Sequence, residues 1–488
     1  MECRPSLAEL REIAAGGEYK TAPVSCELLA DCTTPIETLR VLKNASTHCY
    51  LLESAMADET WGRYTFLGYQ PKKAISCVGG KLTVGGETFS VENPSEYLRK
   101  ILAEYKSPRF PYLPPFAGGL VGYWSYDYLG YSEPSVRGNA LDTEDFKDVD
   151  VMLFDRVIAF DNVRQKIVLI VNIPLDNVET AYREAVDELR KMADLIRHGA
   201  KKEEPAGHLT GEVTELFSRE QYCEMVERAK GYIREGDIFQ IVLSNRLSAP
   251  FEGSLLNTYR VLRTINPSPY MFYFSGTDVE VAGASPETLV KLEDGVLHTF
   301  PLAGTRPRGK TMLEDAELQS ELLADEKELA EHNMLVDLGR NDLGKISRFG
   351  TVAVEKYLQI EKFSHVMHIG STVRGRIREN CDALDAIEAV LPAGTLSGAP
   401  KIRACQLIGE LENNKRGIYG GAIGYIDFTG NMDTCIAIRI AYRKNGKVFV
   451  RSGAGIVADS VPEKEYEECR NKAMASLRAL SLAQEVDE

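Results

Sequence analysis

Residues 422–453, AIGYIDFTGNMDTCIAIRIAYRKNGKVFVRSG, decide the fold class because they combine alternating apolar positions with two turn signals. Thr429-Gly430-Asn431 and Asn445-Gly446 each separate two β-rich runs, which is the pattern of consecutive β-hairpins. Further strands are predicted at three earlier apolar runs, CYLLES (49–54), VIAFDN (157–162) and KIVLIVNI (166–173). We therefore expect antiparallel sheets.

Helical patterns interrupt these strands. Residues 177–198, NVETAYREAVDELRKMADLIRH, repeat apolar side chains at intervals of three and four. Ser218, with Gln221 three residues later, predicts a capped helix through residue 236. The next run, DIFQIVLSNRL (237–247), is almost continuously apolar and predicts a buried strand. The pattern is α+β, with helices packed outside large, mostly antiparallel sheets.

The length of 488 residues suggests two or three domains, or one large domain with a smaller partner. The charged, aperiodic stretch at 196–214, which carries Gly and Pro, breaks the apolar pattern. We place the boundary there, and expect an N-terminal domain over residues 1–205 and a second domain over 216–488.

The formal net charge of −15 disfavours nucleic acid or an anionic membrane as the main partner, because binding to phosphates needs excess Lys and Arg. An anionic substrate would need a local basic pocket. The first residues, MECRPSLAELREIAAG, contain no apolar signal core, and no stretch approaches the roughly 18 apolar residues of a membrane span. We expect a cytoplasmic protein.

Two polar residues interrupt apolar strands. In CIAIRIAY the alternation places Arg439 on one strand face with small neighbours, opposite the face of Ile436, Ile438 and Ile440. Arg439 would then either bind a carboxylate in a bidentate contact or extend into water at a sheet edge. Gln240, within the strand at 237–247, is either a hydrogen-bonded core residue or part of a pocket.

Two acidic pairs stand three residues apart in helical contexts, Glu328 with Glu331 and Glu465 with Glu468. Such pairs form either solvated acidic faces or, with a cation, a Mg²⁺ site, since Mg²⁺ commonly takes one or two carboxylates. His365 and His368 also stand three apart, but no third ligand has suitable spacing, which disfavours zinc. One of them could still act as an acid–base group.

Residues 304–311, GTRPRGKT, fit the P-loop pattern but are rejected as a nucleotide site. Pro307 removes a backbone donor that should contact phosphate, and Pro301 breaks the preceding strand. No clear apolar strand ending in Asp follows to hold Mg²⁺.

An ordered series of segments resembles the chorismate-utilising enzyme family, over nearly the whole chain and most densely from 236 to 475. The segments are DIFQIVLSNR, GASPETLV, PLAGTRPRG, DEKELAEHNMLVDLGRNDLG, FSHVMH, PAGTLSGAPK, GIYGGAIGY, IAIRIAY, GAGIVADS and EYEEC. Each is weak alone, but the set in this order is specific.

The resemblance implies the family's fold and a role for each matching residue. Mg²⁺ would be bound by Glu331 and Glu468, with Glu328 and Glu465 supporting through water. The carboxylates of chorismate would be held by Arg439, Tyr419 and the loop of Gly453, Ala454 and Gly455, in a pocket lined by Thr395, Gly304 and Thr305. Glu287 resembles the general acid for departure of the C4 hydroxyl, and His368 resembles the histidine associated with the later loss of the C2 proton and of enolpyruvate.

Two positions separate branches of this family. Water-using relatives carry a lysine where this chain has Gln240, and aminodeoxychorismate-forming relatives typically read PIKGT where this chain reads PLAGT, with Ala303. The resemblance therefore implies direct attack by ammonia, giving anthranilate and pyruvate. The alternatives are formation of aminodeoxychorismate, or a catalytically silent regulator that binds chorismate or tryptophan.

The resemblance also implies partners. No glutaminase motif is found in this chain, so a separate glutamine amidotransferase subunit would supply ammonia in a hetero-oligomer. LLES (51–54) and NPSPYMF (266–272) resemble the family's tryptophan feedback site, with Glu53 and Ser54 for the ammonium and with Pro269, Tyr270 and Met271 as the indole wall. The alternative is an ordinary strand and turn. Arg63 and Tyr64 replace a lysine of enteric relatives.

Overall fold

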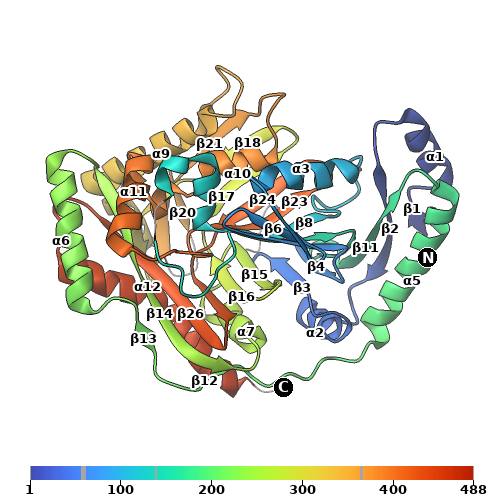
Figure 1. Cartoon of the computed structure of the whole chain (residues 1–488), viewed down its shortest axis with the longest axis horizontal. Helices are drawn as coiled ribbons and strands as arrows, with labels where there is room; N and C mark the ends of the chain where they lie inside the picture. Colours follow the sequence, from blue (N-terminus) through green and yellow to red (C-terminus); the bar gives the residue numbers. More distant parts are fainter. Residues whose placement is uncertain (1, 56–61, 138–139, 363–365, 487–488) are drawn as a thin grey trace.

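Two antiparallel β-sheets, of 14 and 12 strands, form the centre of the molecule, and helices cover them from outside (Figure 1). The computed structural model describes residues 2–55, 62–137, 140–362 and 366–486. The predicted α+β class, with large antiparallel sheets and outer helices, is confirmed.

The 14-stranded sheet contains the long strands near the C-terminus. Its order is β1 (Cys3–Arg4), β2 (Thr21–Leu29), β11 (Lys166–Pro174), β10 (Arg156–Asp161), β4 (Tyr64–Tyr69), β3 (Cys49–Glu53), β15 (Tyr270–Ser275), β16 (Glu280–Ser285), β25 (Ile440–Lys444), β26 (Lys447–Ile456), β14 (Gln240–Glu252) and β12 (His208–Leu209). Two short strands, β13 (Thr214–Glu215) and β22 (Gly398–Ala399), also pair with β14.

The 12-stranded sheet lies against the first. Its order is β19 (Leu302–Pro307), β21 (Val366–Arg376), β18 (Val296–Thr299), β17 (Thr288–Glu293), β24 (Met432–Ile436), β23 (Ala422–Asp427), β8 (Gly119–Trp124), β9 (Val149–Phe154), β5 (Lys73–Val78), β6 (Lys81–Val84) and β7 (Glu87–Ser90), and β20 (Ala353–Lys362) pairs with β21.

Strands from both sides of the 196–214 stretch contribute to each sheet. β3 pairs with β15 in the first sheet, and β8 pairs with β23 in the second. The stretch itself begins where α5 (Val178–His198) ends, and it runs on to β12 and β13. The division into domains 1–205 and 216–488 stays a prediction.

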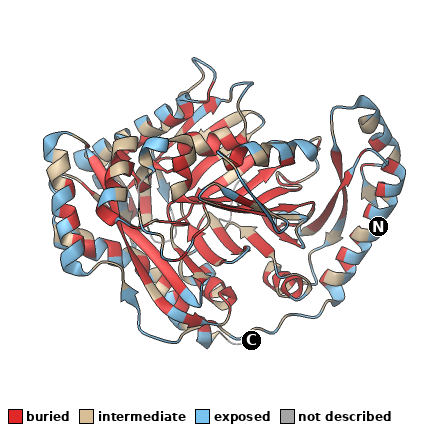
Figure 2. Ribbon diagram, viewed as in Figure 1, coloured by how far each residue is buried: buried red, intermediate tan, exposed pale blue. Residues whose placement is uncertain are grey.

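The inner faces of the two sheets meet in an aromatic-rich core. Its largest side chains include Tyr50, Tyr123, Phe154, Phe272 and Tyr442, all buried. Figure 2 shows this burial as the continuous red of the central strands. Large aromatic residues bury much apolar area, so this layer fixes the two sheets against each other.

The outer faces are covered by separate sets of helices. The 14-stranded sheet packs against α1 (Leu7–Gly16), α2 (Pro35–Ala45), α5, α7 (Leu256–Ile265) and α12 (Pro462–Leu482). The 12-stranded sheet packs against α3 (Pro94–Glu104), α9 (Glu326–Gly344) and α10 (Ala383–Val390). The remaining helices are α4 (Leu129–Ser132), α6 (Arg219–Glu235), α8 (Met312–Ala324) and α11 (Lys401–Glu412), with short 3-10 turns η1 (Tyr126–Tyr128), η2 (Pro134–Val136), η3 (Gly394–Leu396) and η4 (Ala483–Glu485).

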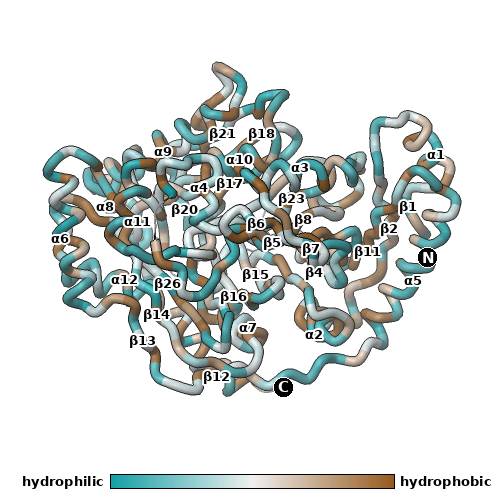
Figure 3. Tube along the Cα trace, in the orientation of Figure 1, coloured by the Kyte–Doolittle hydropathy of each residue, from teal (hydrophilic) through white to brown (hydrophobic). Residues whose placement is uncertain are grey.

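Local sequence signals explain several element boundaries. Ser218 caps α6 and exchanges hydrogen bonds with Gln221, as the capping-box pattern predicts. Asn445 and Gly446 join β25 to β26 with φ of 52° and 69°, the two positive values that a tight hairpin requires. Along α5 hydrophilic and hydrophobic residues alternate (Figure 3), and the buried ones recur every three or four positions.

The predicted continuous strand through CIAIRIAY is wrong. β24 ends at Ile436 in the 12-stranded sheet and β25 begins at Ile440 in the other, so the chain crosses between sheets at 437–439. Arg439 has a φ of 56°, which turns the backbone out of the extended conformation. The alternation of side chains is interrupted there, and Ile436 and Ile440 pack into different cores.

Among the residues described, none of the helices combines the length and apolarity that a membrane span needs. The segment 304–311 does not form a phosphate loop. It begins in strand β19, and the backbone amides of Gly309 and Lys310 donate to the carboxylates of Asp315 and Glu314.

Candidate active site

Glu287 lies in the connection between β16 and β17, at the floor of a pocket that also contains Thr395. Thr395, in η3, donates a hydrogen bond of 3.0 Å from Oγ1 to Oε1 of Glu287. The backbone is fixed by Ile436, whose N–H donates to the carbonyl of Glu287 over 2.9 Å. Burial raises the pKa of Glu287 to about 7, while the hydrogen bond from Thr395 opposes that rise.

His368 lies on β21 beside the Gly304-Thr305 turn of β19. Its Nδ1 is 2.8 Å from the carbonyl oxygen of Gly304 and 3.1 Å from Oγ1 of Thr305. Because a carbonyl only accepts, Nδ1 carries the hydrogen and Nε2 is the basic nitrogen. Burial lowers the pKa of His368, with a smaller contribution from Arg439, so the ring is held neutral. His365 lies outside the described residues.

Gly304 brings the acidic helix α9 next to His368. Its φ of 66° favours glycine, and a Cβ there would lie only 3.2 Å from Oε2 of Glu328. The carboxylate of Glu328 therefore packs against the same turn that orients His368. Two residues from separate sequence motifs are thus neighbours in space.

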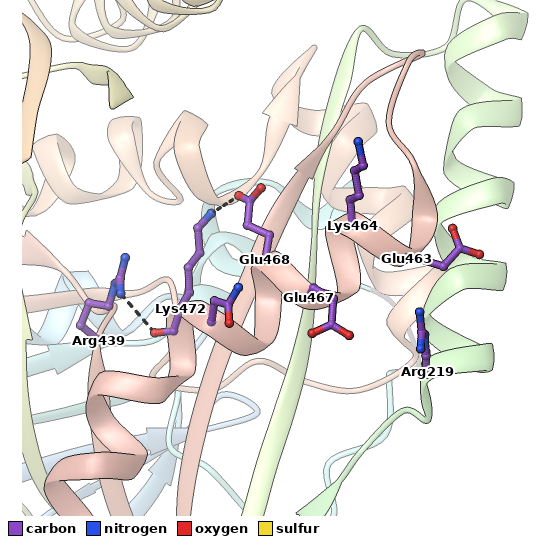
Figure 4. Close-up of a pocket in the computed structure, with 8 residues that line it drawn as sticks. Arg219, Arg439, Glu463, Lys464, Glu467, Glu468 and Lys472 are labelled. Carbon is purple, nitrogen blue, oxygen red and sulfur yellow. Dashed lines mark hydrogen bonds and ion pairs between the residues drawn. The ribbon is translucent and has the colours of Figure 1, made fainter. Parts of the chain in front are cut away.

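Arg439, turned by its positive φ, faces a crevice along α12 (Figure 4). One guanidinium nitrogen donates to the carbonyl of Lys472 over 3.2 Å. Burial lowers the pKa of Arg439, and the nearby Tyr419 opposes this shift. Arg439 is therefore partly desolvated beside open space, the environment in which a bidentate contact with a carboxylate is strongest.

Lys472 joins the parts of the site and was missed by the sequence interpretation. Its Nζ lies 2.7 Å from Oε1 of Glu468 and donates to the carbonyl of Gly453 over 3.2 Å. It also lowers the pKa of Glu287. The available signal was its position four residues after Glu468, one helical turn along the same face.

The glycine-rich end of β26 forms another wall. A Cβ on Gly453 would lie 2.7 Å from the carbonyl of Leu243 and 3.0 Å from the hydroxyl of Tyr419. A Cβ on Gly455 would lie 2.8 Å from the amide nitrogen of Gln240, which places that side chain against the loop. Ala454, between the two glycines, is buried. These residues do not form the loop expected from the sequence, because they lie within β26 and pair with β14. They form a narrow strip of strand backbone next to Tyr419 and Gln240.

Comparison with known proteins shows the family of the chain. Residues 47–478 match the family model described as chorismate binding enzyme, which is most of the chain. The chain belongs to the chorismate-binding enzyme family. Its curated relatives include anthranilate synthase component 1 of Acetivibrio thermocellus, 46% identical with 99% of each chain covered, and that of Aquifex aeolicus, 43% identical over the full length of both.

Solved structures of chorismate-binding enzymes share the fold. Anthranilate synthase component I from Streptococcus pneumoniae superposes with a TM-score of 0.77 at 36% identity, covering 92% of this chain and 98% of that one. MenF, the menaquinone-specific isochorismate synthase of Escherichia coli, gives 0.69 at 19% identity over 98% of this chain and 100% of that one. The second similarity concerns the fold alone.

Enzymes of the chorismate-binding family are generally Mg²⁺-dependent, so we tested whether the acidic pairs fit the ion. Burial and the charge of Glu331 raise the pKa of Glu328, and burial together with the charge of Glu468 raises the pKa of Glu465. Crowded carboxylates of this kind suit a divalent cation in donor chemistry.

The two pairs come from different helices, α9 and α12. The charge of Lys327 on α9 opposes the rise in the pKa of Glu465 on α12, so the two helices are close enough for their charges to interact. In the described part of the chain no three acidic, His or Cys side chains converge on one point. The four glutamates therefore do not form a metal-ligand cluster by themselves, and a Mg²⁺ ion bound here would need water and substrate oxygens as further ligands.

A second pocket lies between β3, β15 and β24. All five residues predicted for the tryptophan site line it, namely Glu53, Ser54, Pro269, Tyr270 and Met271. Its walls also include Arg63, Tyr64, Lys291, Asp433 and Cys435, of which the last three were not foreseen. Arg63 forms an ion pair with Asp161 over 2.9 Å.

The carboxylate of Glu53 already has partners. Arg263 approaches its Oε1 to 2.6 Å, and the hydroxyl of Tyr259 donates to the same oxygen. Both partners lie on α7, which follows β14 in the sequence. Glu53 thus anchors the pocket wall to α7, and its charge is balanced before any ligand binds.

Proposed function

We propose that this chain is the chorismate-converting component of an anthranilate synthase, which aminates chorismate and releases pyruvate. The observation that carries the proposal is the half-buried Glu287, whose pKa of about 7 allows it to be protonated at neutral pH near Lys472, which lines the same crevice as Arg439. The full-length relatives named anthranilate synthase component 1 support the same activity.

Substrate binding would use the cationic side of the site. Arg439 and Lys472 face the same crevice, and the Gly453–Gly455 part of β26 offers backbone next to the Tyr419 hydroxyl. Such groups suit the carboxylates of a small dianion. Mg²⁺, held by Glu331 and Glu468 with Glu328 and Glu465 nearby, would neutralise the ring carboxylate.

The chemical steps then follow from two side chains. Glu287 donates its proton to the C4 hydroxyl, which leaves as water while ammonia adds at C2 and the ring double bonds shift. The new C2 ammonium group loses one proton to solvent, and Glu287 regains one from solvent. His368, with Nδ1 bound to the Gly304 carbonyl, accepts the C2 proton at Nε2. The electron pair of that C–H bond forms the aromatic ring as the enolpyruvyl group departs and is protonated to pyruvate.

Ammonia is the nucleophile in this proposal. The side chain of Gln240 is an amide, which cannot deprotonate water at neutral pH, and Ala303 offers no amine. The Nζ of Lys472 contacts Oε1 of Glu468 and donates to the carbonyl of Gly453. A separate glutamine amidotransferase subunit supplies the ammonia, in a hetero-oligomer that acts in the cytoplasm.

The second pocket is proposed to bind L-tryptophan as a feedback inhibitor. Pro269 and Met271 give it an apolar wall, and Ser54 and Asp433 give it acceptors for an ammonium or an indole N–H. Because Glu53 is already paired with Arg263, it contributes through the wall rather than as the main ammonium ligand.

The product assay tests the proposal. The purified chain is incubated with chorismate, Mg²⁺ and excess ammonium at pH 8, with and without tryptophan. Fluorescent anthranilate and an equal amount of pyruvate are expected. Accumulation of aminodeoxychorismate without pyruvate would assign the chain to the rival activity, and absence of any turnover would favour a silent binding protein.

A further inference from the structure

A cluster of three side chains separates the second pocket from the Glu287 pocket. The hydroxyl of Tyr270 lies 2.8 Å from Oγ1 of Thr288 and donates to Oδ1 of Asp433 over 2.9 Å. Tyr270 and Asp433 line the second pocket, whereas Thr288 lines the pocket of Glu287. One layer of side chains is therefore shared by both cavities.

The hydrogen bonds in this cluster have a defined direction. A carboxylate only accepts, so the single hydroxyl hydrogen of Tyr270 is committed to Asp433. Thr288 must then donate its hydroxyl hydrogen to the oxygen of Tyr270. If Asp433 accepts a hydrogen bond from another donor, the effect reaches Thr288 through a single atom, the hydroxyl oxygen of Tyr270.

The cluster is also tied to Glu287 through the backbone. Thr288 follows Glu287 directly and pairs with Cys435 of β24, another residue of the second pocket. The next residue, Ile436, donates its N–H to the carbonyl of Glu287 over 2.9 Å, and its own carbonyl accepts from Ser285 over 2.6 Å. Both the side-chain and the strand connection therefore end on the predicted general acid.

A ligand in the second pocket would compete with the Tyr270 hydroxyl for hydrogen bonding to the carboxylate of Asp433. The side chain of Asp433 is half-buried, and desolvation raises its pKa, while Lys291 and the hydroxyl of Tyr270 oppose that rise. An ammonium or an indole N–H entering this cavity offers a new donor, because a buried carboxylate gains most from charge-assisted or additional hydrogen bonds. The Tyr270 hydroxyl would then be released or redirected.

We propose that the Tyr270–Thr288–Asp433 cluster transmits ligand binding in the second pocket to the position of Glu287. The inference rests on the proposed function, in which the ligand is tryptophan. Thr288 is a positioning residue in this scheme, since it contacts neither chorismate nor tryptophan in the proposed roles. The cluster contributes to the free energy that couples the second pocket to the Glu287 pocket, and not to the affinity of the second pocket for its ligand.

The test compares Thr288→Val with Thr299→Val in the purified chain. Both are buried threonines of the Glu287 pocket, but Thr299 has no hydrogen bond to Tyr270 and serves as the matched control. Tryptophan binding is measured by calorimetry with and without chorismate, and the chorismate Kd is measured in the same way, without ammonia, with and without saturating tryptophan. Linkage requires the same coupling factor in both directions.

Thr288→Val is expected to bind tryptophan within about threefold of the wild-type Kd, while the coupling factor falls towards one. Thr299→Val is expected to keep the wild-type factor. A wild-type coupling factor in Thr288→Val would overturn the inference. An equal loss of coupling in Thr288→Val and Thr299→Val would overturn it too, as would a loss of coupling in Thr288→Val that is explained by weaker tryptophan binding. Failure of the wild-type chain to form anthranilate or to bind tryptophan would instead contradict the proposed function, and this inference with it.

Discussion

Thr395 donates a hydrogen bond of 3.0 Å to the carboxyl of Glu287, whose pKa burial raises to about 7. The two effects oppose each other, because a hydrogen bond donated to a carboxylate stabilises its charged form and burial destabilises it. Lys472 also favours the charged form. The balance leaves this acid close to half protonated at neutral pH, where it can both hold and release a proton.

The pH dependence of kcat/KM should show this balance. Glu287 must be protonated to act, so kcat/KM should fall as pH rises through about 7. In Thr395→Val the charged form loses its hydrogen bond, and the alkaline limb should move to higher pH. Profiles for wild type, Thr395→Val and Thr299→Val are compared at saturating Mg²⁺. An unmoved limb in Thr395→Val would show that another group controls it.

Replacing the acid should remove catalysis and leave binding. Glu287→Gln keeps the shape and the contact with Thr395 but has no acidic proton. We expect kcat to fall by about 10²- to 10⁴-fold, the usual contribution of a general acid. Chorismate affinity, measured by calorimetry, should change by less than about threefold. Retained turnover above one tenth of wild type would exclude Glu287 from this role.

The acidic pairs should determine the Mg²⁺ requirement. Glu331→Gln and Glu468→Gln each remove one carboxylate, and the Mg²⁺ concentration for half-maximal activity should rise at least tenfold. Glu467→Gln is the control, because Glu467 lines the same crevice on the same helix. If the Mg²⁺ dependence of activity in either variant equals that of Glu467→Gln, the replaced carboxylate does not bind the metal.

Lys472 should contribute to chorismate binding. Lys472→Met retains most of the apolar stem and removes the ammonium that contacts Glu468 and the Gly453 carbonyl. Loss of one charge-assisted hydrogen bond, worth about 1.5–3 kcal/mol, predicts a rise in KM of roughly 10- to 150-fold. Lys464→Met, two turns earlier on α12 and lining the same crevice, should keep a near-normal KM. Equal effects would show only a nonspecific change of charge.

The second pocket predicts a separate phenotype for Ser54. Ser54→Ala should raise the tryptophan concentration for half inhibition about five- to twentyfold, the range for one lost buried hydrogen bond, with nearly unchanged uninhibited turnover. Ser275→Ala, at the other end of β15, is the matched control. Inhibition curves in the presence of fixed chorismate provide the measurement. An unchanged curve for Ser54→Ala would move the inhibitor site away from this pocket.

Much of the fold could be predicted from the sequence because its signals are local. The capping box at Ser218 and Gln221 and the Asn445-Gly446 turn involve residues within a few positions of each other. Strand alternation and helical periodicity act over similar distances, so the α+β class followed from them. The ordered motifs also pointed to the chorismate-binding family before any geometry was known.

The sequence by itself thus determined the elements, the family and the set of side chains available for chemistry. Only the tertiary structure decided that the chain changes sheets at Arg439 and that Arg263 forms an ion pair with Glu53. It also decided that Lys472 contacts both Glu468 and the carbonyl of Gly453. Arg263 and Glu53 are 210 positions apart along the chain. Hydrophobic periodicity records which face of an element is buried, but not which distant element covers it, so contacts of this kind appear only once the sheets have packed.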